Sequence, residues 1–142
     1  MQADSSETVQ GTAQQYVHWF RNSAPYINAH RNKTFVLMFG GEALLSDNFQ
    51  HIIHDIALLH SLGIRLILVH GARPQISDNL KEKNLKSPFH NNRRITTRES
   101  LSSVMSAVGS IRLEIEALLS MGLANSPMYG ARIDVVSGNF VI

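Results

Sequence analysis

The sequence predicts an α/β fold built on parallel strands. Two segments support this prediction, because each is a continuous apolar run that ends at glycine and leads into a helical pattern: residues 35–41 (Phe-Val-Leu-Met-Phe-Gly-Gly) and residues 66–74 (Leu-Ile-Leu-Val-His-Gly-Ala-Arg-Pro). Buried parallel strands are almost continuously hydrophobic, and open α/β sheets bind ligands where loops leave the carboxyl ends of the strands. We therefore expect the two glycine loops to lie side by side and to form one anion site.

The composition narrows the class of protein. The 142 residues suffice for one domain, and a net charge of +2 from scattered residues does not favour nucleic acid or a membrane surface as a partner. The absence of cysteine excludes disulfides and thiolate metal sites, which fits a cytoplasmic protein. No window approaches the roughly 18 apolar residues that a membrane span requires, and the first ten residues do not resemble a secretory signal.

The N-terminal region has two parts in this interpretation. Residues 1–13 are small and polar, which predicts a disordered tail. Within the segment 14–27 we predict a short helix that ends before Pro25. It carries an aromatic face of Tyr16, Trp19 and Phe20. This face would either pack onto its own domain or join subunits of a homo-oligomer.

The next three elements predict a right-handed parallel βαβ unit. A strand over residues 34–39 is followed by a helix that Asp47 could cap with Gln50 three residues later, and that Gly63 would end. A second strand covers residues 64–70. The apolar stripe of the intervening helix is Ile52, Ile53, Ile56 and Leu59.

Further helices follow the second strand. Pro74 opens a short helix to about Lys83, the polar residues 84–94 predict a loop, and Thr96 with Glu99 forms a capping box for a helix that runs to about residue 121. The predicted buried face of this last helix is Leu101, Val104, Val108, Ile111, Ile115 and Leu118, with Gly109 in close packing and Gly122 as its C-cap.

The C-terminal region predicts two strands. Residues 132–136 and 140–142 are apolar and flank a turn at Ser137-Gly138-Asn139. Because the final residues are apolar, we expect the chain to stop within a fold.

The glycines could bind an anion. Gly40, Gly41 and Gly71 allow backbone N–H groups to approach a phosphate or carboxylate, and the helix that starts near Pro74 adds the positive end of its dipole. Neither a G-x-G-x-x-G nor a P-loop motif is present, so the glycines could equally well only turn the chain.

Three histidines share one predicted helix. His51 and His54 lie on one face, but His60 lies far around the helix and no H-E-x-x-H motif occurs. We interpret them as surface residues and predict no metal site.

Several segments together resemble the amino acid kinase family, in particular its acetylglutamate kinase branch and the related N-acetylglutamate synthases. The resemblance covers the chain from about Tyr16 onward. Besides the two glycine loops, the segments that carry it are residues 26–31 (Tyr-Ile-Asn-Ala-His-Arg), 55–59 (Asp-Ile-Ala-Leu-Leu), 94–96 (Arg-Ile-Thr), 116–122 (Glu-Ala-Leu-Leu-Ser-Met-Gly) and 135–140 (Val-Val-Ser-Gly-Asn-Phe).

The sequence departs from the kinases at two positions and there resembles the synthases. The kinases carry a lysine two residues before the Gly-Gly pair and a His-Gly-Gly-Gly-Pro loop, whereas this chain has Met38 and Ala72-Arg73. Methionine cannot neutralise a transferring phosphoryl group, and an arginine is bulky where two glycines would bring backbone to phosphate. Phosphoryl transfer is therefore disfavoured.

The resemblance implies a partial three-layer α/β/α sandwich with a mainly parallel sheet. It also implies that the chain is the first part of an arginine-sensing regulatory domain, with L-arginine as the allosteric ligand of the complete domain. The parent enzyme would transfer acetyl from acetyl-CoA to L-glutamate in the first step of arginine biosynthesis. The chain alone would be non-catalytic and would hold no cofactor.

The resemblance also implies a role for Arg94, which matches a family arginine that pairs with a substrate carboxylate. A solvated loop arginine is the alternative, and Arg73 could close on an anion or pair with a local acid. The candidate ligand-binding residues are Gly40, Gly41, Gly71, Ala72, Arg73 and Arg94. Two other functions remain open: an active kinase in which Arg73 replaces the lysine, and a pure assembly module.

Overall fold

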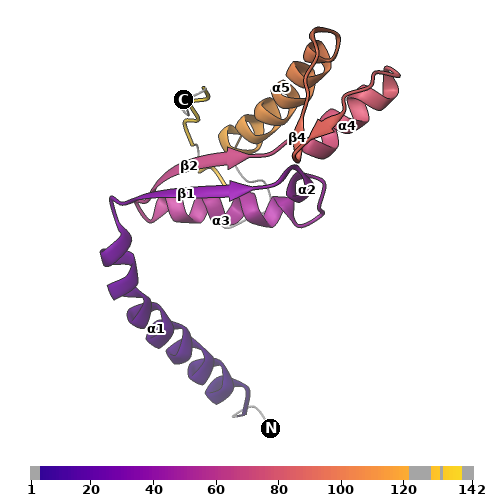
Figure 1. Cartoon of the computed structure of the whole chain (residues 1–142). Helices are drawn as coiled ribbons and strands as arrows, with labels where there is room; N and C mark the ends of the chain where they lie inside the picture. The colour runs from indigo at the N-terminus through magenta and orange to yellow at the C-terminus, as the bar shows by residue number, and fades with distance from the viewer. Residues whose placement is uncertain (1–3, 122–128, 132, 139–142) are drawn as a thin grey trace.

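The computed structural model describes residues 4–121, 129–131 and 133–138 (Figure 1). The helices and strands are α1 (Asp4–His30), β1 (Thr34–Phe39), α2 (Gly41–Leu44), α3 (Phe49–Ser61), β2 (Arg65–His70), α4 (Arg73–Glu82), β3 (Phe89–His90), β4 (Arg93–Arg94) and α5 (Arg98–Ser120). None of the helices in these ranges is long and apolar enough to cross a membrane.

The predicted parallel unit is confirmed. Strand β1 pairs in parallel with β2, from Thr34 opposite Arg65 to Phe39 opposite His70, and α3 connects the two strands. Only one face of this sheet is covered by the described residues. Its side chains Leu37, Phe39, Leu66 and Leu68 pack against the core, whereas Val36, Met38 and Ile67 on the other face are exposed.

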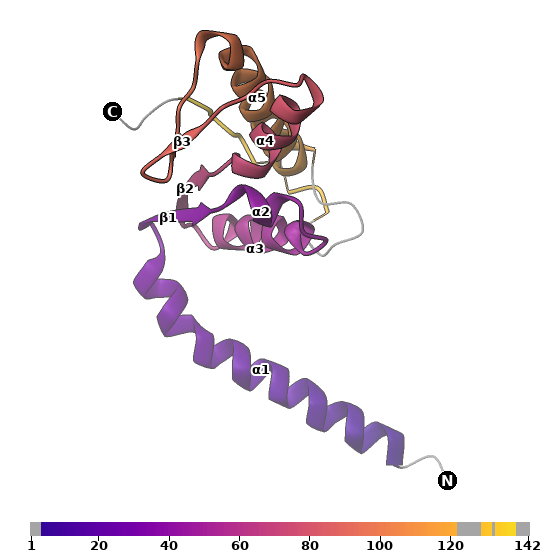
Figure 2. The ribbon, with the colours of Figure 1, turned by 45° about the vertical axis from the view of Figure 1, so that its right-hand side comes forward.

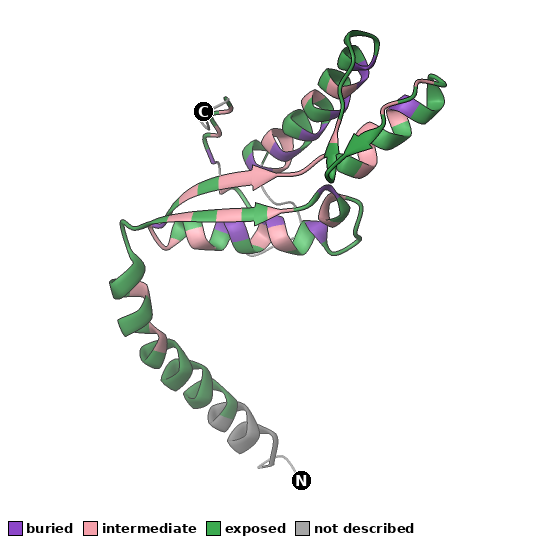
Figure 3. Cartoon of the chain, viewed as in Figure 1, coloured by how far each residue is buried: buried purple, intermediate pink, exposed green. Residues whose placement is uncertain are grey.

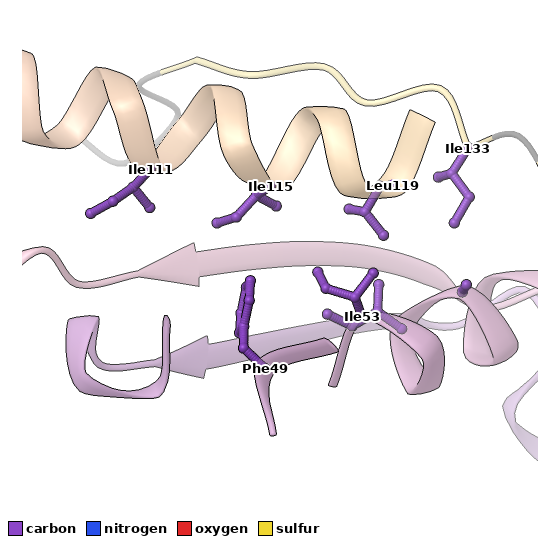
Figure 4. Packing of buried hydrophobic residues seen from close by; sticks show 8 residues of the cluster. Phe49, Ile53, Ile111, Ile115, Leu119 and Ile133 are labelled. Carbon is purple, nitrogen blue, oxygen red and sulfur yellow. The ribbon is translucent and has the colours of Figure 1, made fainter. Parts of the chain in front are cut away.

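The core lies between α3, α5 and the covered face of the sheet. Figure 4 shows Ile111, Ile115 and Leu119 of α5 pointing toward Phe49 and Ile53 of α3. Ile133, from the segment after α5, is buried in the same cluster. Burial of apolar surface in one shared cluster is the main favourable term that holds the βαβ unit to α5.

Helix α3 differs from its prediction at the start. Asp47 is not the cap: Asn48 occupies that position without a side-chain cap bond, and Phe49 begins the helix. The short helix α2 precedes it and was not predicted. The buried residues are Phe49, Ile53, Ile56 and Ala57, while Ile52 and Leu59 are only partly buried. Gly63 follows the helix with a φ of +84°, in the left-handed region where glycine is favoured.

Helix α1 is longer than the prediction in both directions. It begins at Asp4, within the segment predicted as a tail, and it continues through Pro25 to His30, beyond the predicted end. Proline removes a single backbone donor, and the helix continues past it. After its last residue, Arg31 N donates to Ile27 O at 2.9 Å. Figures 1 and 2 show α1 projecting away from the other elements, and Figure 3 shows it exposed along most of its described length.

Helix α5 starts one residue later than predicted and turns a different face inward. Its N-cap is Thr97, not Thr96, and the Thr97 side chain accepts from Ser100 N at 3.2 Å. The buried residues are Ser100, Ser103, Ala107, Ile111, Ile115 and Leu119. Leu101 and Val108 of the predicted stripe are exposed, and α5 contacts α4, where Asn79 Nδ2 donates to the Ser103 carbonyl oxygen.

Two further predictions near α5 differ from the structure. Close packing around Gly109 is wrong, since a Cβ at this residue would meet nothing within 4 Å. Residues 133–138 form no strand, so the predicted strand over residues 132–136 is not found in its described part. The predicted cap Gly122, Arg132 and residues 139–142 lie outside the described residues.

The predicted loop over residues 84–94 contains a small hairpin. Strands β3 and β4 pair antiparallel, with Phe89 opposite Arg94 and His90 opposite Arg93. Asn91 and Asn92 form the turn, both with positive φ (47° and 61°), as two-residue hairpin turns require.

Candidate anion site

The two glycine loops meet at the carboxyl ends of β1 and β2, as the parallel pairing predicts. Gly71 N donates to the Phe39 carbonyl oxygen at 2.9 Å, and Gln75 Nε2 donates to the Gly41 carbonyl oxygen at 2.7 Å. The structure therefore brings the Gly40-Gly41 loop and the Gly71-Ala72-Arg73 loop together.

The backbones of the two loops approach each other closely. A Cβ at Gly71 would lie 3.0 Å from Gly41 N, and a Cβ at Gly41 would lie 2.8 Å from Pro74 Cδ and 3.1 Å from Ala72 Cα. Real Cβ atoms rarely approach so closely, so the absence of a side chain is needed for the loops to fit. This packing role exists with or without a ligand, and anion binding by the same glycines stays a prediction.

The first turn of α4 lies beside the Gly40-Gly41 loop. Ala72 is the N-cap residue, and Pro74 lies in the first turn, where its missing N–H costs no hydrogen bond. The free N–H groups at such a helix start carry partial positive charge. Gln75 lies in this first turn, next to Gly41. Its buried Oε1 has no hydrogen-bond partner among the described residues.

Arg73 turns toward the β3–β4 hairpin. Its Nη2 donates to the Asn92 carbonyl oxygen at 3.2 Å, and its guanidinium carbon lies 5.6 Å from the centre of the Phe89 ring. The alternative in which Arg73 pairs with a local acid is not seen in the described part of the chain, where the ion pair found is Arg112–Glu116.

Arg94 reaches the same aromatic ring from β4. Its guanidinium carbon lies 4.6 Å from the Phe89 ring centre, and its Nη2 donates to Ser77 Oγ of α4 at 2.6 Å. Arg94 is therefore partly buried and held in place, not a freely solvated loop residue. No sequence motif marks Phe89, Ser77 or Gln75; the one available signal is an aromatic residue in an otherwise polar loop.

Met38 lies near the end of β1 on the open face of the sheet and is 81% exposed. Residues 34–44, which form β1, Gly40 and α2, include no lysine or arginine. The cation nearest in sequence to Gly71 is Arg73, and the one nearest to Gly40-Gly41 is Lys33, which precedes β1 at the opposite end of the strand. Around the loops the structure offers backbone N–H groups and guanidinium groups, which can bind an anion but supply no ammonium group from β1.

The aromatic face lies on a different part of the molecule. Tyr16, Trp19 and Phe20 are 70%, 68% and 63% exposed on α1, so the alternative in which they pack onto their own domain is wrong. The histidine rings of His51 and His54 lie 6.3 Å apart. Among the residues that the structure describes, no group of three or more histidine, aspartate or glutamate side chains is placed to hold a metal ion.

Comparison with known proteins finds relatives that share one name, amino-acid acetyltransferase. The chain is 56% identical over all its 142 residues to the amino-acid acetyltransferase of Buchnera aphidicola subsp. Acyrthosiphon pisum, and 58% identical over 126 residues (89% of the chain) to that of Azotobacter vinelandii. It spans about 30% of the length of these relatives.

A solved structure has a similar fold. The crystal structure of N-acetylglutamate synthase from Neisseria gonorrhoeae, complexed with coenzyme A and L-arginine, matches with a TM-score of 0.73 and 32% identity. The match covers 88% of this chain and 29% of that one. The sequence model of the Amino acid kinase family matches residues 33–141. This match includes β1, α3, β2 and both glycine loops, and it shows that the chain belongs to the amino acid kinase family.

Proposed function

We propose that the chain is the N-terminal segment of the kinase-like, arginine-sensing domain of an N-acetylglutamate synthase. The parent protein transfers acetyl from acetyl-CoA to L-glutamate in the first step of arginine biosynthesis, in the cytoplasm, and this segment is regulatory and non-catalytic. The support is the identity of more than 50% to amino-acid acetyltransferases over the whole chain or most of it. The matched synthase structure, which holds coenzyme A and L-arginine, supports the same ligands for the parent.

The observation that carries the non-catalytic role is Met38. A methionine stands at the end of β1, two residues before Gly40-Gly41, where the resembling kinases have a lysine. Losing one preorganised charge of this kind typically costs on the order of 10²–10³ in rate. Arg73 does not offer a replacement in this structure, because its guanidinium is directed to Asn92 and Phe89.

The test uses the full-length protein that carries this sequence. We expect acetyl transfer from acetyl-CoA to L-glutamate, an effect of L-arginine on that rate, and no MgATP binding in a calorimetric titration. An ADP-release assay with N-acetylglutamate is the matched control for the kinase alternative. Tight, magnesium-dependent ATP binding or N-acetylglutamate-dependent ADP release would contradict the proposal.

Anion binding belongs to the same proposal. The loops Gly40-Gly41 and Gly71-Ala72 lie at the start of α4, and Arg73 and Arg94 are both close to it. Titration with inorganic phosphate and with N-acetylglutamate, followed by NMR at the amides of Gly40, Gly41 and Gly71, checks this step. If neither anion shifts these amides, the glycines have only the packing role described above.

A further inference from the structure

The two arginines of the candidate site converge on one exposed aromatic ring. Arg73 comes from the first turn of α4 and Arg94 from β4, and their guanidinium carbons lie 5.6 Å and 4.6 Å from the centre of the Phe89 ring. Both distances are within the range of a cation–π contact. Through this ring Arg73 connects the hairpin to the start of α4, whereas the contact of Arg94 with the ring lies within the hairpin.

Two hydrogen bonds join the same two elements. Arg73 Nη2 donates to the carbonyl oxygen of Asn92 in the hairpin turn at 3.2 Å, and Arg94 Nη2 donates to Ser77 Oγ of α4 at 2.6 Å. Arg73 thus reaches from α4 to the hairpin, while Arg94 reaches from the hairpin to α4. Each arginine makes one hydrogen bond across the gap and one contact with Phe89.

A hairpin this small needs such support. Strands β3 and β4 have two residues each, and an isolated two-stranded hairpin is at best marginally stable in water. Phe89 is exposed, so it does not anchor the hairpin by burial in the core. Beyond the base of the hairpin, where Ile95 N donates to Pro88 O at 2.8 Å, the contacts with Arg73, Arg94 and Ser77 are what hold it against α4.

We propose that Arg73 and Arg94 clamp the Phe89 ring and so fix the 89–94 hairpin to the start of α4, beside the glycine loops (Figure 1). In this role Arg73 is a positioning residue, because it determines where the hairpin lies. The inference goes beyond the proposed regulatory function and does not depend on it.

Hydrogen–deuterium exchange in the full chain tests the clamp. The reporter is amide exchange across residues 89–95, including Ile95, and the reference is the Arg65 amide, which donates to Lys33 O at 2.9 Å at the far end of β2. Arg73→Ala removes one cation–π contact and one hydrogen bond, each worth a factor of a few in an equilibrium. We expect exchange in the hairpin to become about tenfold faster and the Arg65 amide to be unchanged.

Two other variants complete the test. Arg93→Ala is the matched control, because it removes the same charge from the hairpin at an exposed side chain that makes no hydrogen bond, ion pair or ring contact with the described residues; it should leave exchange unchanged. Phe89→Leu removes the ring that both arginines contact and should accelerate exchange as Arg73→Ala does. The clamp is ruled out if Arg73→Ala or Phe89→Leu leaves hairpin exchange at the original rate, if Arg93→Ala accelerates it equally, or if the Arg65 amide accelerates to the same extent.

Discussion

At the scale of single residues, the two adjacent glycines after β1 have different surroundings. A Cβ at Gly41 would meet Pro74 Cδ at 2.8 Å and Ala72 Cα at 3.1 Å, which are parts of the neighbouring loop that cannot easily move. A Cβ at Gly40 would meet only the Glu42 side chain, which is exposed and free to turn away.

Alanine substitutions should separate these two environments. Gly41→Ala forces the loops apart, and overpacking of this kind typically costs about 1–3 kcal/mol in the free energy of unfolding. Gly40→Ala is the matched control and should stay within about 0.5 kcal/mol, as most surface substitutions do. Urea unfolding of both variants checks this. Equal stability of the two would show that the loops do not pack as the structure has them.

Gly109 gives a prediction of opposite sign. It lies inside α5, and a Cβ there would meet nothing within 4 Å, so an alanine fits without any rearrangement. Because glycine in a helix interior is about 1 kcal/mol less favourable than alanine, Gly109→Ala should stabilise the protein and raise its melting temperature by roughly 3 °C. Circular dichroism during thermal unfolding measures the change. A lower melting temperature would mean that the glycine is needed for packing after all.

At the scale of the helices and strands, the start of α5 depends on one hydroxyl. Thr97 is the N-cap and its side chain accepts from Ser100 N at 3.2 Å, whereas Thr96 precedes the cap. Thr97→Ala should lower the free energy of unfolding by about 1 kcal/mol, the usual effect of losing a cap. Thr96→Ala, one residue away and also exposed, should change it little. A larger effect of Thr96→Ala in chemical denaturation would place the cap at the residue that the capping-box pattern favours.

The parallel unit could be predicted from the sequence because its signals are strong and local. Apolar runs that end at Gly40 and Gly71 mark two strands, and the parallel arrangement then places both loops at one edge. The buried face of α5 could not be predicted from apolarity. Ser100, Ser103 and Ala107 are buried although they are small and two of them are polar, while the more apolar Leu101 is exposed.

Part of the candidate site could also be predicted from the strong local signals of the two strands. Its glycines and Arg73 follow directly from the strand ends, so their meeting required only the parallel rule. Phe89 was missed because the two-residue strands β3 and β4 are too short to show a period, and the hairpin appeared in the sequence as a polar loop. The role of Arg94 depends on that ring and could not be derived before the hairpin was placed.

At the scale of the whole molecule, large apolar side chains are exposed in several places within the described residues, and two of these are candidate interaction surfaces. The first is the open face of the sheet, with Val36, Met38 and Ile67, and the second is the aromatic face of α1 (Figure 3). Large exposed apolar patches commonly mark interaction sites. The aromatic face is the sharper candidate, because Tyr16, Trp19 and Phe20 are spaced to share one side of a helix that projects away from the core.

We therefore predict that the α1 helix joins copies of the chain. Trp19→Ala with Phe20→Ala keeps good helix formers but removes two aromatic side chains, each of which contributes about 1.5–3 kcal/mol when it becomes buried. The association constant should fall roughly 100-fold or more, and light scattering should report the mass of a single protomer. Arg21→Ala, an exposed neighbour on the same helix, should leave the mass of the assembly unchanged. Deletion of residues 1–27 should reproduce the effect of the double variant. If both the deletion and the double variant keep the original mass, subunits associate elsewhere, and the open face of the sheet becomes the surface to test.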